Sequence, residues 1–157
     1  MSKLIERVKD ILKDNMWLVI STVDEKNQPH SSVVIYQSDG EDLYIQTGSK
    51  TLKAKNIKRN NKVSITIPFR KNLLHKIIPA PPAELHFTAI AKEISKEDEK
   101  AREILGKFVK DAEKVANEDK TVWFKIIPSN TISTYGVGVP VWYMRKPEKA
   151  RNIITLK

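Results

Sequence analysis

Short runs of alternating or β-branched residues, separated by turn-forming clusters, occupy the first half of this chain. Residues 16–23 alternate between two faces, and the β-branched run 31–37 and the short run 43–47 follow them. The intervening sequences, 24–27 and 38–40, are rich in the Asp, Asn, Ser and Gly residues that form tight turns. Connections this short join neighbouring strands, so the pattern predicts an antiparallel meander.

Three other segments carry apolar residues at helical spacing. Residues 3–14 have one apolar stripe, and a short helical stretch is expected over about 50–59. The sequence 95–98 (SKED) matches a capping box and predicts the start of a helix that runs to about Asn117. The other expected elements are strands at 63–67, 84–94, 122–127 and 131–135, a loop at 68–82, and short strands or edge segments at 141–145 and 152–156.

Together these elements predict a mainly β fold in one domain that spans residues 1–157. Six or seven short strands with two or three helices indicate a small antiparallel barrel or sandwich whose helices lie at the periphery. A length of 157 residues suits a single domain. A boundary inside the chain would cut the meander.

The composition excludes several classes of protein. The chain has no Cys, which excludes a disulfide scaffold, a thiolate zinc site and a cysteine nucleophile. No apolar run approaches the ~18–20 residues that a membrane helix needs. The first segment, MSKLIERVKDILKDN, is amphipathic and contains acids, unlike a signal peptide or a typical transit peptide. We therefore expect a soluble cytoplasmic protein with no membrane partner.

The charge of the chain is concentrated in one segment. Lys and Arg number 28 against 19 Asp and Glu, which gives a formal net charge of +9. Residues 43–83 contain nine Lys or Arg and no acid, so the remainder of the chain is balanced. A local excess favours a site for a defined anion, although a solvated basic face gives the same pattern.

The segment TGSKTLK, from Thr47 to Lys53, places hydroxyls and lysines where a strand gives way to a helix. Free backbone N–H groups at a helix start favour anions. Thr47, Ser49 and Thr51 can donate hydrogen bonds, and Lys50 and Lys53 supply positive charge. The pattern predicts a phosphate site. The alternative is that Ser49 is only a helix N-cap and that the lysines are solvated.

Catalytic constellations are scarce in this sequence. His30, His75 and His86 are far apart and lack metal-ligand spacing, so we expect no metal site and assign no catalytic residue. A G-x-S-x-G nucleophile elbow is absent. The G-x-G of Gly136 and Gly138 has no third glycine and no surrounding βαβ unit, which excludes a dinucleotide fingerprint.

The order of these features resembles a known family. Residues 18–67, LVISTVDEKNQPHSSVVIYQSDGEDLYIQTGSKTLKAKNIKRNNKVSITI, resemble the FMN-binding split-barrel proteins related to pyridoxamine 5′-phosphate oxidase. In that family a strand, an acidic turn, a second strand, a D-G turn and a strand ending in Thr precede a helix that starts with small residues and Lys. The later ISTYGVGVPVWYMRKPEKARNI resembles the C-terminal region of small prokaryotic members. The resemblance implies a six- to seven-stranded split β-barrel.

The resemblance also implies that FMN is the cofactor and assigns residues to it. Lys53 is implied as the lysine of the flavin phosphate, with Thr51 two residues before it and Thr47 as a strand-end contact. Glu84 stands near a flavin-contacting residue that the partner subunit supplies. The other residues implied are Ser32, Val33, Val34 and Ile35, on the strand along the isoalloxazine ring, and Ser49 and Lys50 in the turn.

Further implications concern assembly and reaction. The family places its cofactor at a two-fold interface, so we expect a homodimer and an oxidoreductase acting on an unidentified small molecule. Trp123, Tyr135 or Trp142 could cover the ring. Ser32 stands where the oxidase has an Arg, and residues 141–145 replace its Arg-x-His substrate signature, so vitamin B6 oxidation is not carried over.

Two alternatives to an FMN enzyme stay open. The same fold could hold the deazaflavin F420, which would also use a basic phosphate site. A non-catalytic module could instead bind nucleic acid through the cluster from Lys50 to Lys62, with Tyr44 and Phe69 nearby. Against this second alternative, the aromatic residues are not interleaved with the basic ones as in stacking platforms.

Overall fold

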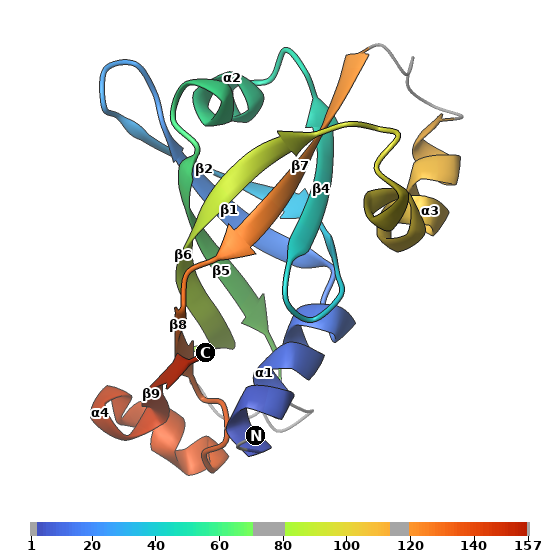
Figure 1. Cartoon of the computed structure of the whole chain (residues 1–157). Helices are drawn as coiled ribbons and strands as arrows, with labels where there is room; N and C mark the ends of the chain where they lie inside the picture. Colours follow the sequence, from blue (N-terminus) through green and yellow to red (C-terminus); the bar gives the residue numbers. More distant parts are fainter. Residues whose placement is uncertain (1–2, 71–80, 114–119, 157) are drawn as a thin grey trace.

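The computed structural model of the chain describes residues 3–70, 81–113 and 120–156, with only the backbone described for 107–113 (Figure 1). The predicted helix end at Asn117 and most of the loop predicted at 68–82 lie outside these residues. The described helices are α1 (Lys3–Asp14), α2 (Leu52–Arg59), α3 (Glu99–Glu113), the 3-10 helix η3 (Val141–Arg145) and α4 (Pro147–Ala150). The strands are β1 (Trp17–Val23), β2 (Pro29–Ile35), β3 (Gln37–Ser38), β4 (Leu43–Gly48), β5 (Lys62–Phe69), β6 (Ala83–Ile94), β7 (Thr121–Pro128), β8 (Thr131–Tyr135) and β9 (Arg151–Thr155).

The described strands form one antiparallel sheet that curls back on itself. Seven of them follow the order β2-β1-β5-β6-β7-β4-β3, while β8 pairs with β6 and β9 pairs with β8. β2 and β3 stand at opposite ends of this order, yet only Tyr36 separates them along the chain. The chain therefore leaves β1 and joins β4 at Tyr36, which closes the curl. The predicted mainly β, split-barrel fold with peripheral helices is confirmed.

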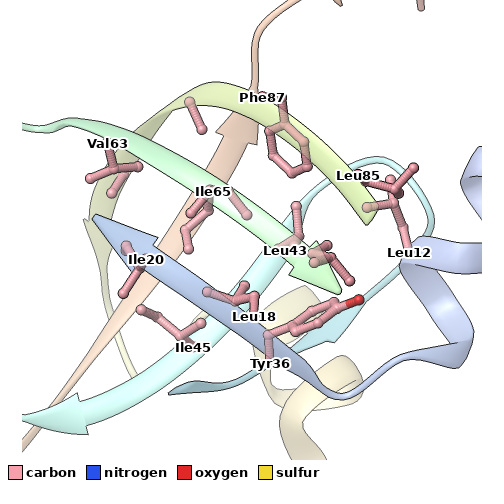
Figure 2. Packing of buried hydrophobic residues seen from close by; sticks show 14 of the residues in the cluster. Leu12, Leu18, Ile20, Tyr36, Leu43, Ile45, Val63, Ile65, Leu85 and Phe87 are labelled. Carbon is pink, nitrogen blue, oxygen red and sulfur yellow. The ribbon is translucent and has the colours of Figure 1, made fainter. Parts of the chain in front are cut away.

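Side chains that point inward from the strands fill the barrel (Figure 2). Alternation along β1 places Leu18 and Ile20 inside, and Ile65 of β5 and Phe87 of β6 meet them there, all buried. Leu12 of α1 enters the same cluster and is also buried. Burying a side chain of this kind contributes roughly 1.5–3 kcal/mol, so the alternation of residues 16–23 decides which face of β1 is inside.

The turn between β3 and β4 is held by three ion pairs, each with a lysine from a different element. Burial raises the pKa of Asp39, but hydrogen bonds from Lys100 and from two backbone amides outweigh this effect, and the pKa is lowered. The hydrogen bond from Lys9 likewise lowers the pKa of Glu41. The three pairs are Lys9 of α1 with Glu41 (2.7 Å), Lys100 of α3 with Asp39 (2.6 Å) and Lys125 of β7 with Asp42 (2.9 Å).

Helix α3 begins later than the capping-box pattern predicts. Asp98 acts as the cap, because its carboxylate accepts a hydrogen bond from the backbone N–H of Ala101 at 2.8 Å. The hydroxyl of Ser95 accepts instead from the backbone N–H of Glu97, within a turn before the helix. Ala101 is fully buried, and packing of this first turn stabilises the helix. The helix therefore begins at the cap closest to Ala101, which is Asp98.

Residues 141–145, predicted as a short strand or edge segment, form the 3-10 helix η3 instead. The backbone N–H of Tyr143 donates to the carbonyl of Pro140 at 3.0 Å, and that of Lys146 donates to the carbonyl of Tyr143 at 2.8 Å. A segment with no neighbouring strand satisfies its backbone groups locally in this way. The segment predicted at 152–156 is strand β9. The one-turn helix α4 adds to the two or three helices expected. No helix in the described ranges is long and apolar enough to cross a membrane.

Tyr36, at the closure of the barrel, carries a buried hydroxyl without a partner among the described residues. Because such a hydroxyl has lost its water, Tyr36→Phe should keep or raise the free energy of unfolding, by up to about 1 kcal/mol. Burial, with Asp14 nearby, also raises the pKa of Tyr36. The folded state therefore disfavours the phenolate, and stability falls as the pH rises above the ordinary tyrosine pKa of about 10.

Urea unfolding at pH 8 and above pH 10 checks both expectations for Tyr36→Phe. The variant should lose less stability than the wild-type protein on going to high pH. Tyr143→Phe removes a hydroxyl from a partly exposed tyrosine and serves as the control. A Tyr36→Phe variant that is less stable than the wild type at pH 8 would show that the hydroxyl has a partner.

Candidate functional site

Helix α2 covers one end of the barrel and is fixed there by buried contacts (Figure 1). Ala54 and Ile57 on its inner face are buried in the core cluster. The side-chain amide of Asn56 donates to the hydroxyl of Thr22 on β1 at 3.1 Å, and both residues are buried. The position of the helix start relative to β1 and β2 therefore follows from the core.

Thr22→Val should lower the free energy of unfolding by about 1–3 kcal/mol, because the change leaves the buried amide of Asn56 without its acceptor. Urea unfolding measures the loss. Adding Asn56→Leu to the first change removes the unpaired group and should recover part of it. A single variant as stable as the wild type would mean that this hydrogen bond does not hold α2 in place.

Thr51 is the N-cap of α2, and its hydroxyl is used for that role. It accepts a hydrogen bond from the backbone N–H of Ala54 at 3.3 Å and donates to the carbonyl of Gly48 at 2.9 Å. The helix thus begins two residues later than predicted. Ser49 is not the cap, since it lies two residues before Thr51; its backbone N–H donates to the carbonyl of Lys120 at 2.8 Å.

Lys53, in the first turn of α2, reaches back to the end of β4. Its Nζ donates to the hydroxyl of Thr47 at 3.4 Å, and that hydroxyl lies 3.5 Å from the hydroxyl of Thr51. The side chain is half-buried and makes no ion pair within the described part of the chain. Three residues of the predicted phosphate site therefore form one connected group whose ammonium has no acidic partner.

A hollow of about 200 Å³ lies between this group and strand β2. Ser32, Thr51 and Lys53, which come from two separate segments, all line it. Thr47 joins them through its hydrogen bond to Lys53. We call this hollow the Lys53 hollow; its lining residues are Thr22, His30, Ser31, Ser32, Thr51, Leu52 and Lys53.

His30 lines the Lys53 hollow but was not predicted as a cofactor residue. Its Nε2 lies 2.9 Å from the carboxylate of Asp24, which also accepts the backbone N–H groups of Lys26 and Gln28. The hydrogen bond with His30, followed by those amides, holds the pKa of Asp24 below its ordinary value. A signal existed in the sequence, because strand alternation puts His30 on the same face as Ser32.

Besides Thr47, six residues of the predicted site lie outside the lining of this hollow: Val33, Val34, Ile35, Ser49, Lys50 and Glu84. Lys50 is exposed in the turn before α2. On β2, Val34 points into the core and is 8% exposed, whereas Val33 is 65% exposed. Ile35 shares the outward face of Val33. From Val33 to Ile35, the strand predicted to lie along the ring thus offers its odd-numbered side chains on the outside, whereas His30 and Ser32, at even positions, line the hollow.

Glu84 lies far from the Lys53 hollow within one chain. It pairs with Pro68 of β5, whereas Lys62, at the other end of β5, follows closely on α2. The six residue-to-residue steps from Lys62 to Pro68 span about 20 Å of strand. One copy of the chain therefore does not bring Glu84 to the group formed by Thr47, Thr51 and Lys53.

Two of the three aromatic residues proposed as flavin cover are used in packing. Trp123 is 3% exposed beneath α3, and its indole N–H donates to the side-chain oxygen of Gln46 at 2.8 Å. Tyr135 is buried, and its hydroxyl donates to the backbone carbonyl of Met144. Trp142 is 68% exposed on η3. In the ranges that the structure describes, no three His, Asp or Glu side chains group to hold a metal ion.

The curled antiparallel sheet, with a helix start and a lysine at one end, has the architecture of the split-barrel proteins. A family model described as pyridoxamine 5′-phosphate oxidase matches residues 4–134, and the chain belongs to this family. The pyridoxine/pyridoxamine 5′-phosphate oxidase of Pseudoalteromonas translucida is 32% identical over 84 residues, which are 52% of this chain and 39% of that protein. The chain thus matches only about two fifths of the length of that relative.

Solved structures of several differently described proteins share the fold. HutZ, a haem storage protein from Vibrio cholerae, superposes with a TM-score of 0.68 at 19% identity, covering 87% of this chain and 98% of that one. An FAD-binding protein from Mesorhizobium loti gives a TM-score of 0.62 at 16% identity, covering 85% and 94%. At these identities the likeness shows the fold alone.

Proposed function

We propose that this chain is a cytoplasmic FMN-binding flavoprotein that acts as an oxidoreductase on a small molecule, with its site between two copies of the chain. The observation that carries the proposal is Lys53, whose half-buried ammonium has no acidic partner in the described residues and faces a hollow shared with Ser32. A phosphate group suits such a site, because charge-assisted hydrogen bonds to phosphate are stronger than neutral ones. FMN carries a phosphate of this kind.

The size of the Lys53 hollow supports a site that continues outside it. Its volume of about 200 Å³ is below the roughly 300–1,000 Å³ of pockets that enclose a whole small molecule. The phosphate end of FMN would lie inside, and the ring would lie beyond it along β2. Val33 and Ile35 offer apolar surface on the other face of β2 from Ser32, so a ring that contacts them would pass over the edge of this strand, which ends the order of strands. A bound flavin supplies hydride or electron transfer, while the chain binds and orients it.

The composition of the outer surface of the sheet supports the proposal that a second copy of the chain covers it. Two rows of paired positions cross it, and none of their ten residues is Asp, Glu, Lys or Arg, although these make up 30% of the chain. Hydrogen bonds within the rows pair Ser21 with Ser31 at 2.7 Å and Thr66 with His86 at 3.2 Å. We call this surface the uncharged face; its rows are Val33-Val19-Thr66-His86-Ser133-Ile153 and Ser31-Ser21-Ser64-Thr88.

The uncharged face also has the shape and exposure of a contact surface. Val33 and Ile153, at the two ends of one row, are 65% and 78% exposed. A hollow of about 680 Å³ lies beside the second row and is lined by Ser21, Ser64 and Thr88 and also by Lys62, the one charged residue of its described lining. Between its two apolar ends the first row is mostly polar but carries no Asp, Glu, Lys or Arg, and depletion of charged residues distinguishes the core of an interface. A second copy of the chain is the occupant that we propose.

A dimer would also explain the position of Glu84. Its distance of about 20 Å from the α2 end means that it reaches a flavin at Lys53 only from the partner subunit. Trp142 belongs to η3, which lies with β8 and β9 at the end of the molecule away from α2 (Figure 1). The same argument makes the partner's Trp142 the available aromatic cover.

The visible spectrum of the purified protein, followed by a titration with FMN, tests the proposed function. We expect either a yellow protein or saturable FMN binding with a shift of the flavin absorbance. A colourless protein that binds no FMN would overturn the proposal. A haem spectrum, or displacement of FMN by F420 in a competition titration, would assign the Lys53 hollow to another cofactor.

The nucleic-acid alternative has less support in the structure. Tyr44, one of its two aromatic residues, is 1% exposed beneath α3 and cannot stack on a base. Lys58 in the basic cluster is paired with Glu93 at 3.1 Å. Nucleic-acid affinity that falls steeply with salt would nevertheless support this alternative.

A further inference from the structure

We propose that His30 is the second cation of the phosphate site in the Lys53 hollow, so that the hollow binds a dianion more tightly when the imidazole is protonated. The inference deepens the proposed function, since it concerns the same hollow. It rests on the charge of the lining residues, on the position of His30 on β2 and on its hydrogen bond to Asp24.

The lining of the hollow without His30 carries less positive charge than a phosphate group needs for neutralisation. A phosphate monoester carries about −1.5 to −2 at neutral pH. Lys53 supplies one positive charge, and the other lining residues apart from His30 are Ser, Thr or Leu. His30 is therefore the one further residue of the described lining that can become cationic. It stands two positions from Ser32, where the oxidase resemblance places an Arg, and on the same face of the strand.

Asp24 occupies one nitrogen of the His30 ring, so only the other nitrogen, Nδ1, is available to a ligand. The lowered pKa of Asp24 keeps its carboxylate ionised, and an ionised carboxylate only accepts hydrogen bonds. Nε2 of His30 must therefore donate to it across the 2.9 Å contact. In the neutral ring, Nδ1 is then an acceptor, which repels a phosphate oxygen. Protonation turns Nδ1 into a donor and adds a positive charge, so both changes favour the anion.

The charged groups around His30 come from two elements. Asp24 of the β1–β2 turn contacts the ring, and Lys53 of α2 lines the same hollow, while Glu25, Lys26, Lys55 and Arg59 line a neighbouring hollow together with Asp24. The side chains of Asp, Glu, Lys and Arg ordinarily keep their charge between pH 5.5 and pH 8, whereas an imidazole changes its charge in this range. A change of anion affinity across this range would therefore report on His30.

Sulfate is the suitable probe, because it stays a dianion between pH 5.5 and pH 8 whereas a phosphate monoester changes its own charge near pH 6. The chain is titrated with sulfate at pH 5.5 and pH 8, with chloride keeping the ionic strength constant. The backbone amide signals of Ser32 and Leu52 are followed by NMR. We expect severalfold tighter binding at pH 5.5, less than the roughly tenfold of a full charge-assisted hydrogen bond, because the carboxylate of Asp24 at 2.9 Å offsets part of the imidazolium charge.

Three variants separate the role of His30 from a general charge effect. His30→Asn should bind sulfate weakly at both pH values, and His30→Arg should bind it tightly at both. Lys26→Ala removes a nearby charge that does not line the hollow and should keep the pH dependence. Equal sulfate affinity at both pH values in the wild-type chain, or an unchanged pH dependence in His30→Asn, would overturn the proposal.

A second pair of ligands keeps this test apart from the test of the proposed function. At pH 6, His30→Asn should weaken FMN binding severalfold and leave the binding of riboflavin, which has no phosphate, unaffected. If the wild-type chain binds no FMN, the proposed function fails while the sulfate titration still tests His30. If FMN binds equally to both chains, only the inference about His30 fails.

Discussion

Replacing Lys53 by Ala is expected to weaken FMN binding about ten- to a hundredfold and to leave folding unchanged. An ammonium that contacts a phosphate without a competing acid contributes roughly 1.5–3 kcal/mol, and 1.4 kcal/mol is about tenfold in affinity. The fold should tolerate the change, because the hydrogen bond that Lys53 makes is a 3.4 Å contact with Thr47. Flavin fluorescence during titration of the protein with FMN measures the loss, with circular dichroism as the check of folding.

Lys58→Ala is the matched control for Lys53→Ala. Lys58 lies on the same helix with the same charge, but it is exposed and paired with Glu93 at 3.1 Å. Its removal should change FMN affinity by no more than about twofold, as for an ordinary surface ion pair. Riboflavin should bind equally well to the wild-type chain and to both variants. Unchanged FMN affinity in Lys53→Ala would take Lys53 out of the site.

A carboxylate at position 88 is expected to convert the proposed dimer into a monomer. Thr88 is exposed on the uncharged face, so Thr88→Glu should leave one copy folded. In a dimer, each copy would bury a carboxylate, which costs several kcal/mol per ion, a large part of the free energy of an interface of ordinary affinity; Lys62, which lines the same hollow as Thr88, offsets only part of this cost. Analytical ultracentrifugation should show a single species at the chain mass of 18.0 kDa.

The same substitution tests whether the flavin site needs two copies. Thr88 does not line the Lys53 hollow, so FMN affinity should fall in Thr88→Glu only because the ring loses its cover. Glu103→Lys reverses an exposed charge on α3 and should affect neither assembly nor FMN binding. A monomeric wild-type protein that binds FMN as tightly as the variant would refute the shared site.

The inward and outward faces of the barrel strands could be predicted from the sequence, because they depend only on the alternation of side chains along each strand. Leu18 and Ile20 share one face of β1 whatever the neighbouring strand is, and the core confirms that face. The group of Thr47, Thr51 and Lys53 is equally local, since a strand that runs into a helix brings these positions together. The grouping of Ser32 with Lys53 depends on how distant segments pack, and only the family resemblance suggested it.

Other features depended on geometry that spacing does not contain. His30 meets Asp24 because the turn between β1 and β2 sets Thr22 opposite His30, and Asn27 takes a positive φ of 59° in that turn. The closure at Tyr36 requires one extended segment to change partners between β1 and β4. Neither event leaves a periodic signal in the sequence.

The closure of the barrel also suggests where the molecule opens first. β3, the strand that completes the closure, is two residues long, whereas β5 in the wall has eight. The curled sheet is thus closed by one very short strand pairing, between β3 and β4, which we call the clasp. The fastest amide hydrogen exchange of the barrel should lie in this pairing. Asp39 and Glu41 beside the clasp have lowered pKa values, so their ion pairs stabilise it above pH ~4 and are lost as the pH falls through those values. As the pH falls, the pairing of β3 with β4 should therefore open before the other strands of the barrel unfold.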